Sequence, residues 1–93
     1  MSLVVEHRPQ ESRFVVALSA QGPFAQLDYE VAGAVCTFTH TIVPPEFRGQ
    51  GVAAQLVEAG LAWARAQQLR VVPACSYVHT YIQRHREWQD LLS

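Results

Sequence analysis

The fold is decided by the stretch Arg48-Gly49-Gln50-Gly51-Val52-Ala53, which lies between an apolar β-like run ending at Val43 and a helical run beginning at Val52. A strand-to-helix turn with two glycines leaves several backbone N–H groups unpaired at the positive end of a helix dipole. We therefore interpret this stretch as an anion-binding turn that suits a pyrophosphate.

The chain before this turn predicts an antiparallel sheet. Runs rich in β-branched residues are separated by turn chemistry at Gln21-Gly22-Pro23 and at Ala32-Gly33. Pro44-Pro45 must end the last run, because proline offers no N–H to a ladder. The three predicted strands are Arg13–Leu18, Phe24–Val31 and Ala34–Val43.

The chain after the turn predicts a parallel strand-helix-strand unit, because apolar positions recur at helical spacing and a short apolar run follows them. Gly60 weakens the helix, so we expect it where the helix presses on the sheet. Ser76 is a natural N-cap for a second helix. The predicted elements are a helix from Val52 to about Gln67, a strand over Leu69–Cys75, a helix from Ser76 to about His85, and a docked tail over Arg86–Ser93.

Pro73 is the unusual residue of this second unit. A proline inside a parallel strand removes a hydrogen bond, at no cost if that side of the strand has no partner. We therefore expect the strand around Pro73 to splay away from the strand that ends at Val43. Ligands of open α/β sheets bind at such carboxyl ends.

Size and charge exclude several classes of protein. The 93 residues fit one domain, 1–93, and the net charge of −1, with all seven basic residues arginine, gives no field that would attract nucleic acid or a membrane. No apolar run approaches the ~20 residues of a membrane span, and no signal peptide is evident. We expect a cytoplasmic protein whose two cysteines, Cys36 and Cys75, are free thiols at opposite ends of the sheet. The histidines and cysteines have no metal-site spacing.

The stretch Val43–Ala53 resembles the acetyl-coenzyme A motif of the GNAT N-acetyltransferases, Gln/Arg-x-x-Gly-x-Gly/Ala, with Arg48, Gly51 and Ala53 at its fixed positions. The preceding strand, the following helix and the splayed next strand fall in the family's order. The segment Pro73–His85 resembles a subgroup of short GNAT-like proteins. The resemblance implies an α/β, minimal GNAT-like acyl-CoA N-acyltransferase fold with a mixed sheet and two main helices. Without this context, a glycine turn that simply starts a helix would be the favoured interpretation.

The resemblance also implies how acetyl-coenzyme A would be bound. Backbone N–H groups of Arg48, Gly49, Gln50, Gly51, Val52 and Ala53 would hold the pyrophosphate. The backbone of Thr41, Ile42 and Val43 would pair with the pantetheine arm, and an N–H near Ile42 or Val43 would polarise the thioester carbonyl.

The chain departs from the family between its first two strands. Typical members have two additional helices there that help to form the acceptor pocket, whereas this chain has only Gln21-Gly22-Pro23. The acceptor groove is therefore either open or completed by another chain, such as a second copy in a homodimer.

Transfer to an amine needs a base for the amine and an acid for the departing thiolate. Tyr81 lies where many relatives carry a tyrosine that protonates the coenzyme A sulfur, and it is equally explained as a core aromatic. His40, one turn of the strand before the pantetheine segment, has an ordinary pKa of ~6.5 that suits a base. A histidine that faces a helix and bonds a carbonyl explains it as well. His79 is a weaker candidate, either near the ligand or solvated.

Cys75 gives the sharper hypothesis. It ends the splayed strand immediately before a helix N-terminus, which lowers a thiol pKa. Acetyl transfer through Cys75 is then chemically possible, while a buried structural cysteine is the commoner explanation. The sequence thus predicts an acetyl-coenzyme A-dependent N-acetyltransferase acting on an unidentified amine, with a coenzyme A-binding interaction module without catalysis as the alternative.

Overall fold

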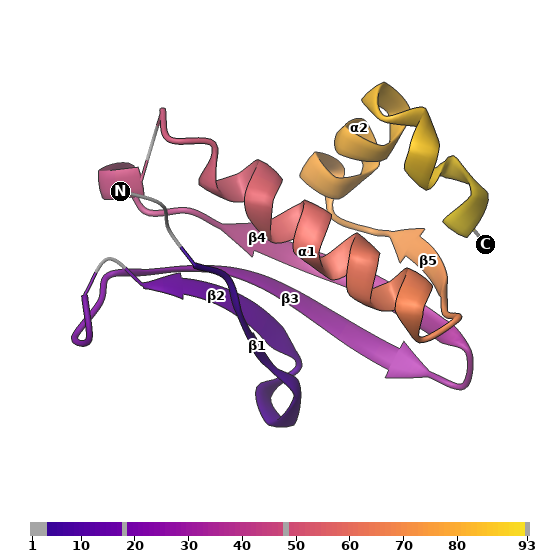
Figure 1. The fold of residues 1–93 in the computed structure, drawn as a ribbon, viewed down its shortest axis with the longest axis horizontal. Coiled ribbons are helices and arrows are strands. Elements are labelled where there is room, and N and C mark those ends of the chain that lie inside the picture. The colour runs from indigo at the N-terminus through magenta and orange to yellow at the C-terminus, as the bar shows by residue number, and fades with distance from the viewer. Residues whose placement is uncertain (1–3, 18, 48, 93) are drawn as a thin grey trace.

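The computed structural model describes residues 4–17, 19–47 and 49–92. They form a mixed five-stranded sheet with helices packed against it (Figure 1). Leu18, Arg48 and Ser93, which the expected strand, turn and tail include, lie outside the described residues. The elements are β1 (Glu6–Arg8), η1 (Pro9–Glu11), β2 (Arg13–Ala17), β3 (Phe24–Ala32), β4 (Val35–Ile42), η2 (Pro45–Phe47), α1 (Val52–Ala66), β5 (Arg70–Pro73), α2 (Ser76–Arg84) and η3 (Arg86–Leu91).

The strands lie in the order β1-β2-β3-β4-β5, antiparallel as far as β4 and parallel between β4 and β5. This confirms the predicted mixed sheet and its strand-helix-strand unit. The sequence did not indicate β1, which has only three residues. This strand pairs with β2, and its His7 side chain adds to that pairing, because the ring stacks on Phe14 at 4.1 Å and its Nε2 lies 2.6 Å from the Tyr29 hydroxyl.

The core lies between the sheet and the helices. Gly60 of α1 is buried, and a Cβ atom there would lie 2.9 Å from Phe38 Cε1 and 3.0 Å from Leu27 Cδ2. Only glycine therefore allows α1 to approach β3 and β4 this closely, as the sequence predicts. The apolar residues of α2 join the same core, and so does Leu91 of η3, which confirms that the tail docks on the body.

A β-bulge divides β4. Tyr29 pairs with Phe38 and Asp28 with His40, so Thr39 is an extra residue in β4. Paired residues share a face of the sheet, and Thr41 therefore faces the helices with buried Leu27. His40 and Ile42 face the other side, which we call the outer face. The bulge breaks the alternation of faces after Phe38, so the alternative of a His40 that faces a helix is wrong.

β5 ends earlier than expected, because its pairing with β4 stops where Pro73 lies opposite Phe38. One further bond, from the Cys75 N–H to the Phe38 carbonyl at 2.9 Å, follows. Beyond it, Thr39 to Ile42 have no strand partner on this side among the described residues. The predicted splay is present at Pro73. None of the helices in the described ranges is long and apolar enough to cross a bilayer.

Candidate functional site

The glycine turn is anchored at both ends and open between them. Phe47 before it and Val52 after it are both 1% exposed, whereas Gly49, Gln50 and Gly51 are exposed. Gln50 Nε2 donates to the Glu46 carbonyl at 3.0 Å, which ties the turn to η2. Burial of the two flanking side chains thus fixes a turn whose backbone faces solvent.

Both glycines of this turn have backbone angles that favour glycine, with φ of +79° at Gly49 and +70° at Gly51. A Cβ atom at either position would meet nothing within 4 Å, so the space above the turn is open. The N–H groups of Ala53 and Ala54 have no backbone acceptor within the described residues, as the first turn of a helix requires. These features are those of an anion-binding helix start. The predicted contribution of Arg48 lies outside the described residues.

The gap between β4 and β5 carries a polar contact. Thr41 Oγ1 of β4 lies 3.3 Å from Cys75 Sγ, so the two side chains meet across the gap. The bulge at Thr39 makes this contact possible, because it turns Thr41 toward the helix side. Thr41 was predicted from the sequence as a backbone ligand only, and its hydroxyl contact with the cysteine was missed.

Cys75, and not Ser76 as predicted, is the N-cap of α2. Its carbonyl accepts the His79 N–H at 3.0 Å, and Ser76 is the first helical residue. Burial by itself raises the pKa of the half-buried Cys75 thiol. Hydrogen bonds from the Thr41 hydroxyl and from the Val78 and Tyr77 backbone N–H groups outweigh burial, and the pKa lies below its ordinary value. The hydrogen bonds therefore shift the thiol toward the thiolate, in the direction that the sequence predicts.

Cys36 has the opposite environment. It is 0% exposed near the start of β4, and burial raises the pKa of its thiol to about 12. Neither cysteine forms a disulfide, which confirms the expectation of two free thiols. Of the two, only Cys75 has the exposure and the hydrogen bonds of a nucleophile.

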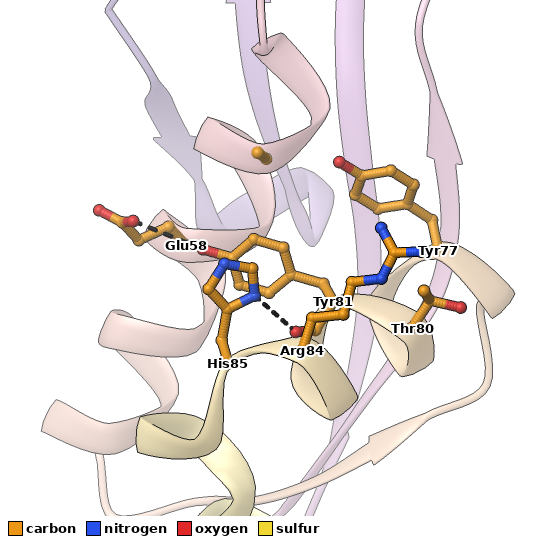
Figure 2. Close-up of a pocket in the computed structure, with 7 residues that line it drawn as sticks. Glu58, Tyr77, Thr80, Tyr81, Arg84 and His85 are labelled. Carbon is orange, nitrogen blue, oxygen red and sulfur yellow. Dashed lines mark hydrogen bonds between the residues drawn. The ribbon is translucent and has the colours of Figure 1, made fainter.

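A cavity of about 380 Å³ lies between α1 and α2 (Figure 2). Tyr81 lies on the inner side of this cavity and is 8% exposed. Its hydroxyl donates a long, 3.5 Å hydrogen bond to Glu58. Burial raises the pKa of this hydroxyl, and the Glu58 carboxylate raises it further, so it stays protonated at neutral pH. The His85 ring stacks on Tyr81 at 4.0 Å, and its Nδ1 donates to the Tyr81 carbonyl at 2.8 Å. The lining residues are Ala54, Glu58, Tyr77, Thr80, Tyr81, Arg84 and His85.

The three catalytic candidates lie in three different places. Cys75 lies at the gap, Tyr81 in the α1–α2 cavity, which Cys75 does not line, and His40 on the outer face. His79 is exposed, with Gln83 as its side-chain neighbour, and it does not line the cavity. The structure therefore does not bring the candidates together.

Other cavity residues were missed by reasoning from the sequence. Tyr77, Tyr81 and Arg84 recur at intervals of four and three residues, a spacing that places side chains on one helix face. This spacing could have identified the α2 residues from the sequence. No sequence pattern indicated Glu58 of α1. In the described ranges no group of three histidine, cysteine or acidic residues could hold a metal ion.

Comparison with known proteins supports one family. A family model described as GCN5-related N-acetyl-transferase matches residues 13–91. Protein NATD1 of Mus musculus is 33% identical over 82 residues, which are 87% of this chain and 74% of that protein. Protein NATD1 of Xenopus tropicalis is 32% identical over 85 residues, 90% of this chain and 78% of that protein.

A solved structure supports the same fold. A GCN5-like protein from Staphylococcus aureus, determined in solution by NMR, superposes with a TM-score of 0.77 at 25% identity. The match covers 98% of this chain and 88% of the other. The mixed sheet and its helices are thus a known arrangement.

Proposed function

Because the chain belongs to the GCN5-related N-acetyltransferase family, we propose that it binds acetyl-coenzyme A and transfers the acetyl group to an amine. The observation that carries this proposal is the contact between Thr41 and Cys75 across the β4–β5 gap. It places a thiol of lowered pKa at the carboxyl end of β4, where the chain continues into the glycine turn. A thioester held between the glycine turn and the Thr41–Cys75 contact would lie next to the Cys75 thiol.

The turn supports binding of the diphosphate. Gly49 and Gly51 leave its outer side open, and the N–H groups of Ala53 and Ala54 lack backbone acceptors among the described residues. The diphosphate would be recognised locally, because a net charge of −1 gives no long-range attraction.

The free edge of β4 supports binding of the pantetheine arm. Thr41, Ile42 and Val43 follow the last pairing with β5, so their backbone groups on that side are open to an extended ligand. An amide of the arm would pair with this edge as another strand does. The N–H near Ile42 or Val43 would then donate to the thioester carbonyl as the charge on its oxygen develops.

Cys75 would receive the acetyl group. Its thiolate attacks the thioester carbonyl, and the bond between that carbon and the coenzyme A sulfur breaks. Coenzyme A leaves as a thiolate and takes a proton from solvent, and a thioester remains on Cys75. A neutral amine then attacks this thioester, loses a proton, and leaves as an amide, which restores the Cys75 thiolate.

Direct transfer without Cys75 is the competing route, and it would use Tyr81 and His40. His40 is exposed on the outer face, and it would take the amine proton. Tyr81 would protonate the departing sulfur only if that sulfur entered the α1–α2 cavity. The gap and the cavity share no residue, so we favour the Cys75 route.

Thiol release from acetyl-coenzyme A tests the function. With a panel of amines, we expect amine-dependent release of free thiol by the wild-type protein and a loss of at least about a hundredfold in Cys75→Ala. Thr39→Val is the matched control, because Thr39 bonds the Asp28 carbonyl and not the cysteine. Tight binding of acetyl-coenzyme A without any thiol release would contradict transfer and would favour a binding module.

A further inference from the structure

The cavity between α1 and α2 lies beside the start of α1. Its lining residues from α1 are Ala54, in the first turn of that helix, and Glu58, and the others come from α2 and from His85, which follows α2 (Figure 2). Thr41 and Cys75, which meet across the β4–β5 gap, do not line it. The turn therefore has two separate spaces near it, the gap and the cavity.

A diphosphate ester has two arms, and this chain offers a space for each. On the proposed function, the thioester arm must lie at the gap, because Cys75 is there. The other arm of coenzyme A is an adenosine with a 3′-phosphate, and the cavity is a second space near the start of α1.

The side chains of the cavity match this arm. Tyr77 is 41% exposed, so its ring offers a flat apolar face to a purine beside the stacked Tyr81–His85 pair. Glu58 offers an acceptor for the exocyclic amine of adenine. The floor is therefore aromatic, with one carboxylate on the α1 side.

Arg84 is the cation of this cavity without a protein partner. Arg8, Arg13 and Arg65 form ion pairs, and Arg70 donates to a carbonyl. Arg84 has neither an ion pair nor a side-chain hydrogen bond in the part of the chain that the structure describes. In Figure 2 its guanidinium and the Glu58 carboxylate point to opposite sides of the cavity. A phosphate would therefore be favoured at the Arg84 side and repelled at the Glu58 side.

We propose that the α1–α2 cavity binds the adenosine end of coenzyme A and that Arg84 selects ligands with a 3′-phosphate. This inference rests on the proposed function, since it takes the ligand from there. It makes Tyr81 a wall of the nucleotide site, which excludes Tyr81 as the acid for a sulfur at the gap.

The test compares binding of coenzyme A with binding of dephospho-coenzyme A, which lacks only the 3′-phosphate. We expect the wild-type protein to bind coenzyme A about tenfold more tightly, the value of one charge-assisted contact at an exposed site. Arg84→Ala should lose this preference, because only its affinity for coenzyme A should fall. Arg84→Lys should keep part of the preference. Arg86→Ala is the matched control, because Arg86 is an exposed neighbour that does not line the cavity. Circular dichroism establishes that each variant is folded.

Tyr77→Ala gives a second readout, since it should weaken both ligands by a similar factor and leave their ratio unchanged. Equal affinities in the wild-type protein, or a preference that survives in Arg84→Ala, would overturn the role of Arg84 while leaving coenzyme A binding intact. If neither ligand binds, the proposed function fails together with this inference.

Discussion

The two halves of β4 have different neighbours. From Val35 to Phe38 the strand is paired with β3 on one side and β5 on the other, and Gly60 of α1 packs on it. From Thr39 to Ile42 it keeps β3 but has no partner on the β5 side among the described residues. The first half is a closed structural region and the second is an open one.

The two cysteines show the difference between the closed and the open half of β4. Cys36, in the closed half, is fully buried, and burial raises the pKa of its thiol to about 12. Cys75 faces Thr41 of the open half, and its hydrogen bonds lower the pKa of its thiol. One half of β4 therefore contains a fully buried thiol, the other half lies beside a half-buried thiol of lowered pKa, and the bulge at Thr39 marks the boundary between the two halves.

The largest expected effect is in the alkylation rates of the two thiols. Cys75 should react with iodoacetamide in the folded protein. Cys36 becomes accessible only when the protein unfolds, which costs at least about 5 kcal/mol in a stable domain. Peptide mass spectrometry should then show Cys75 reacting at least about a thousandfold faster. Similar rates for the two cysteines would mean that the closed half of β4 is not closed.

Gly60→Ala should destabilise the closed half. Helix propensity alone would stabilise the protein by about 1 kcal/mol, but the new Cβ would lie 2.9 Å from Phe38 Cε1. We expect a net loss of about 1–3 kcal/mol in the free energy of unfolding in urea. Ala62→Gly, at an exposed position of α1, measures the propensity term alone. A Gly60→Ala protein more stable than wild type would refute the close packing.

Thr41→Val should change only the open half. It removes the hydroxyl that bonds Cys75 Sγ, so the pKa of the thiol should rise. The pH dependence of Cys75 alkylation measures this as a midpoint moved to higher pH, with less thiolate at neutral pH. Thr39→Val, the matched control, should leave the midpoint in place. An unchanged midpoint in Thr41→Val would show that the contact does not stabilise the thiolate.

Local patterns in the sequence predicted most of the fold. The helical spacing from Val52 and the prolines at 44, 45 and 73 correctly predicted α1, the end of β4 and the splay of β5. Each of these depends on residues close together in the chain. The three-residue β1 was missed, because contacts of His7 with distant Phe14 and Tyr29 hold it.

The candidate site was predictable only in part. The turn and Cys75 have local signatures, but the orientation of His40 and Thr41 depends on a bulge that no residue type in the strand indicates. The pairing of Glu58 with Tyr81 joins two helices and has no local signal. Long-range packing thus decided which candidates face the gap, the cavity or the outer face.

The most direct test of the Cys75 route is the mass of the protein after exposure to acetyl-coenzyme A without an amine. The chain contains no lysine, so no lysine side chain competes for the acetyl group. We predict one added acetyl group that maps to the peptide containing Cys75, is released by hydroxylamine as a thioester should be, and is absent in Cys75→Ser. Amine-dependent turnover with Cys75 unmodified throughout, and with full activity in Cys75→Ser, would contradict the account.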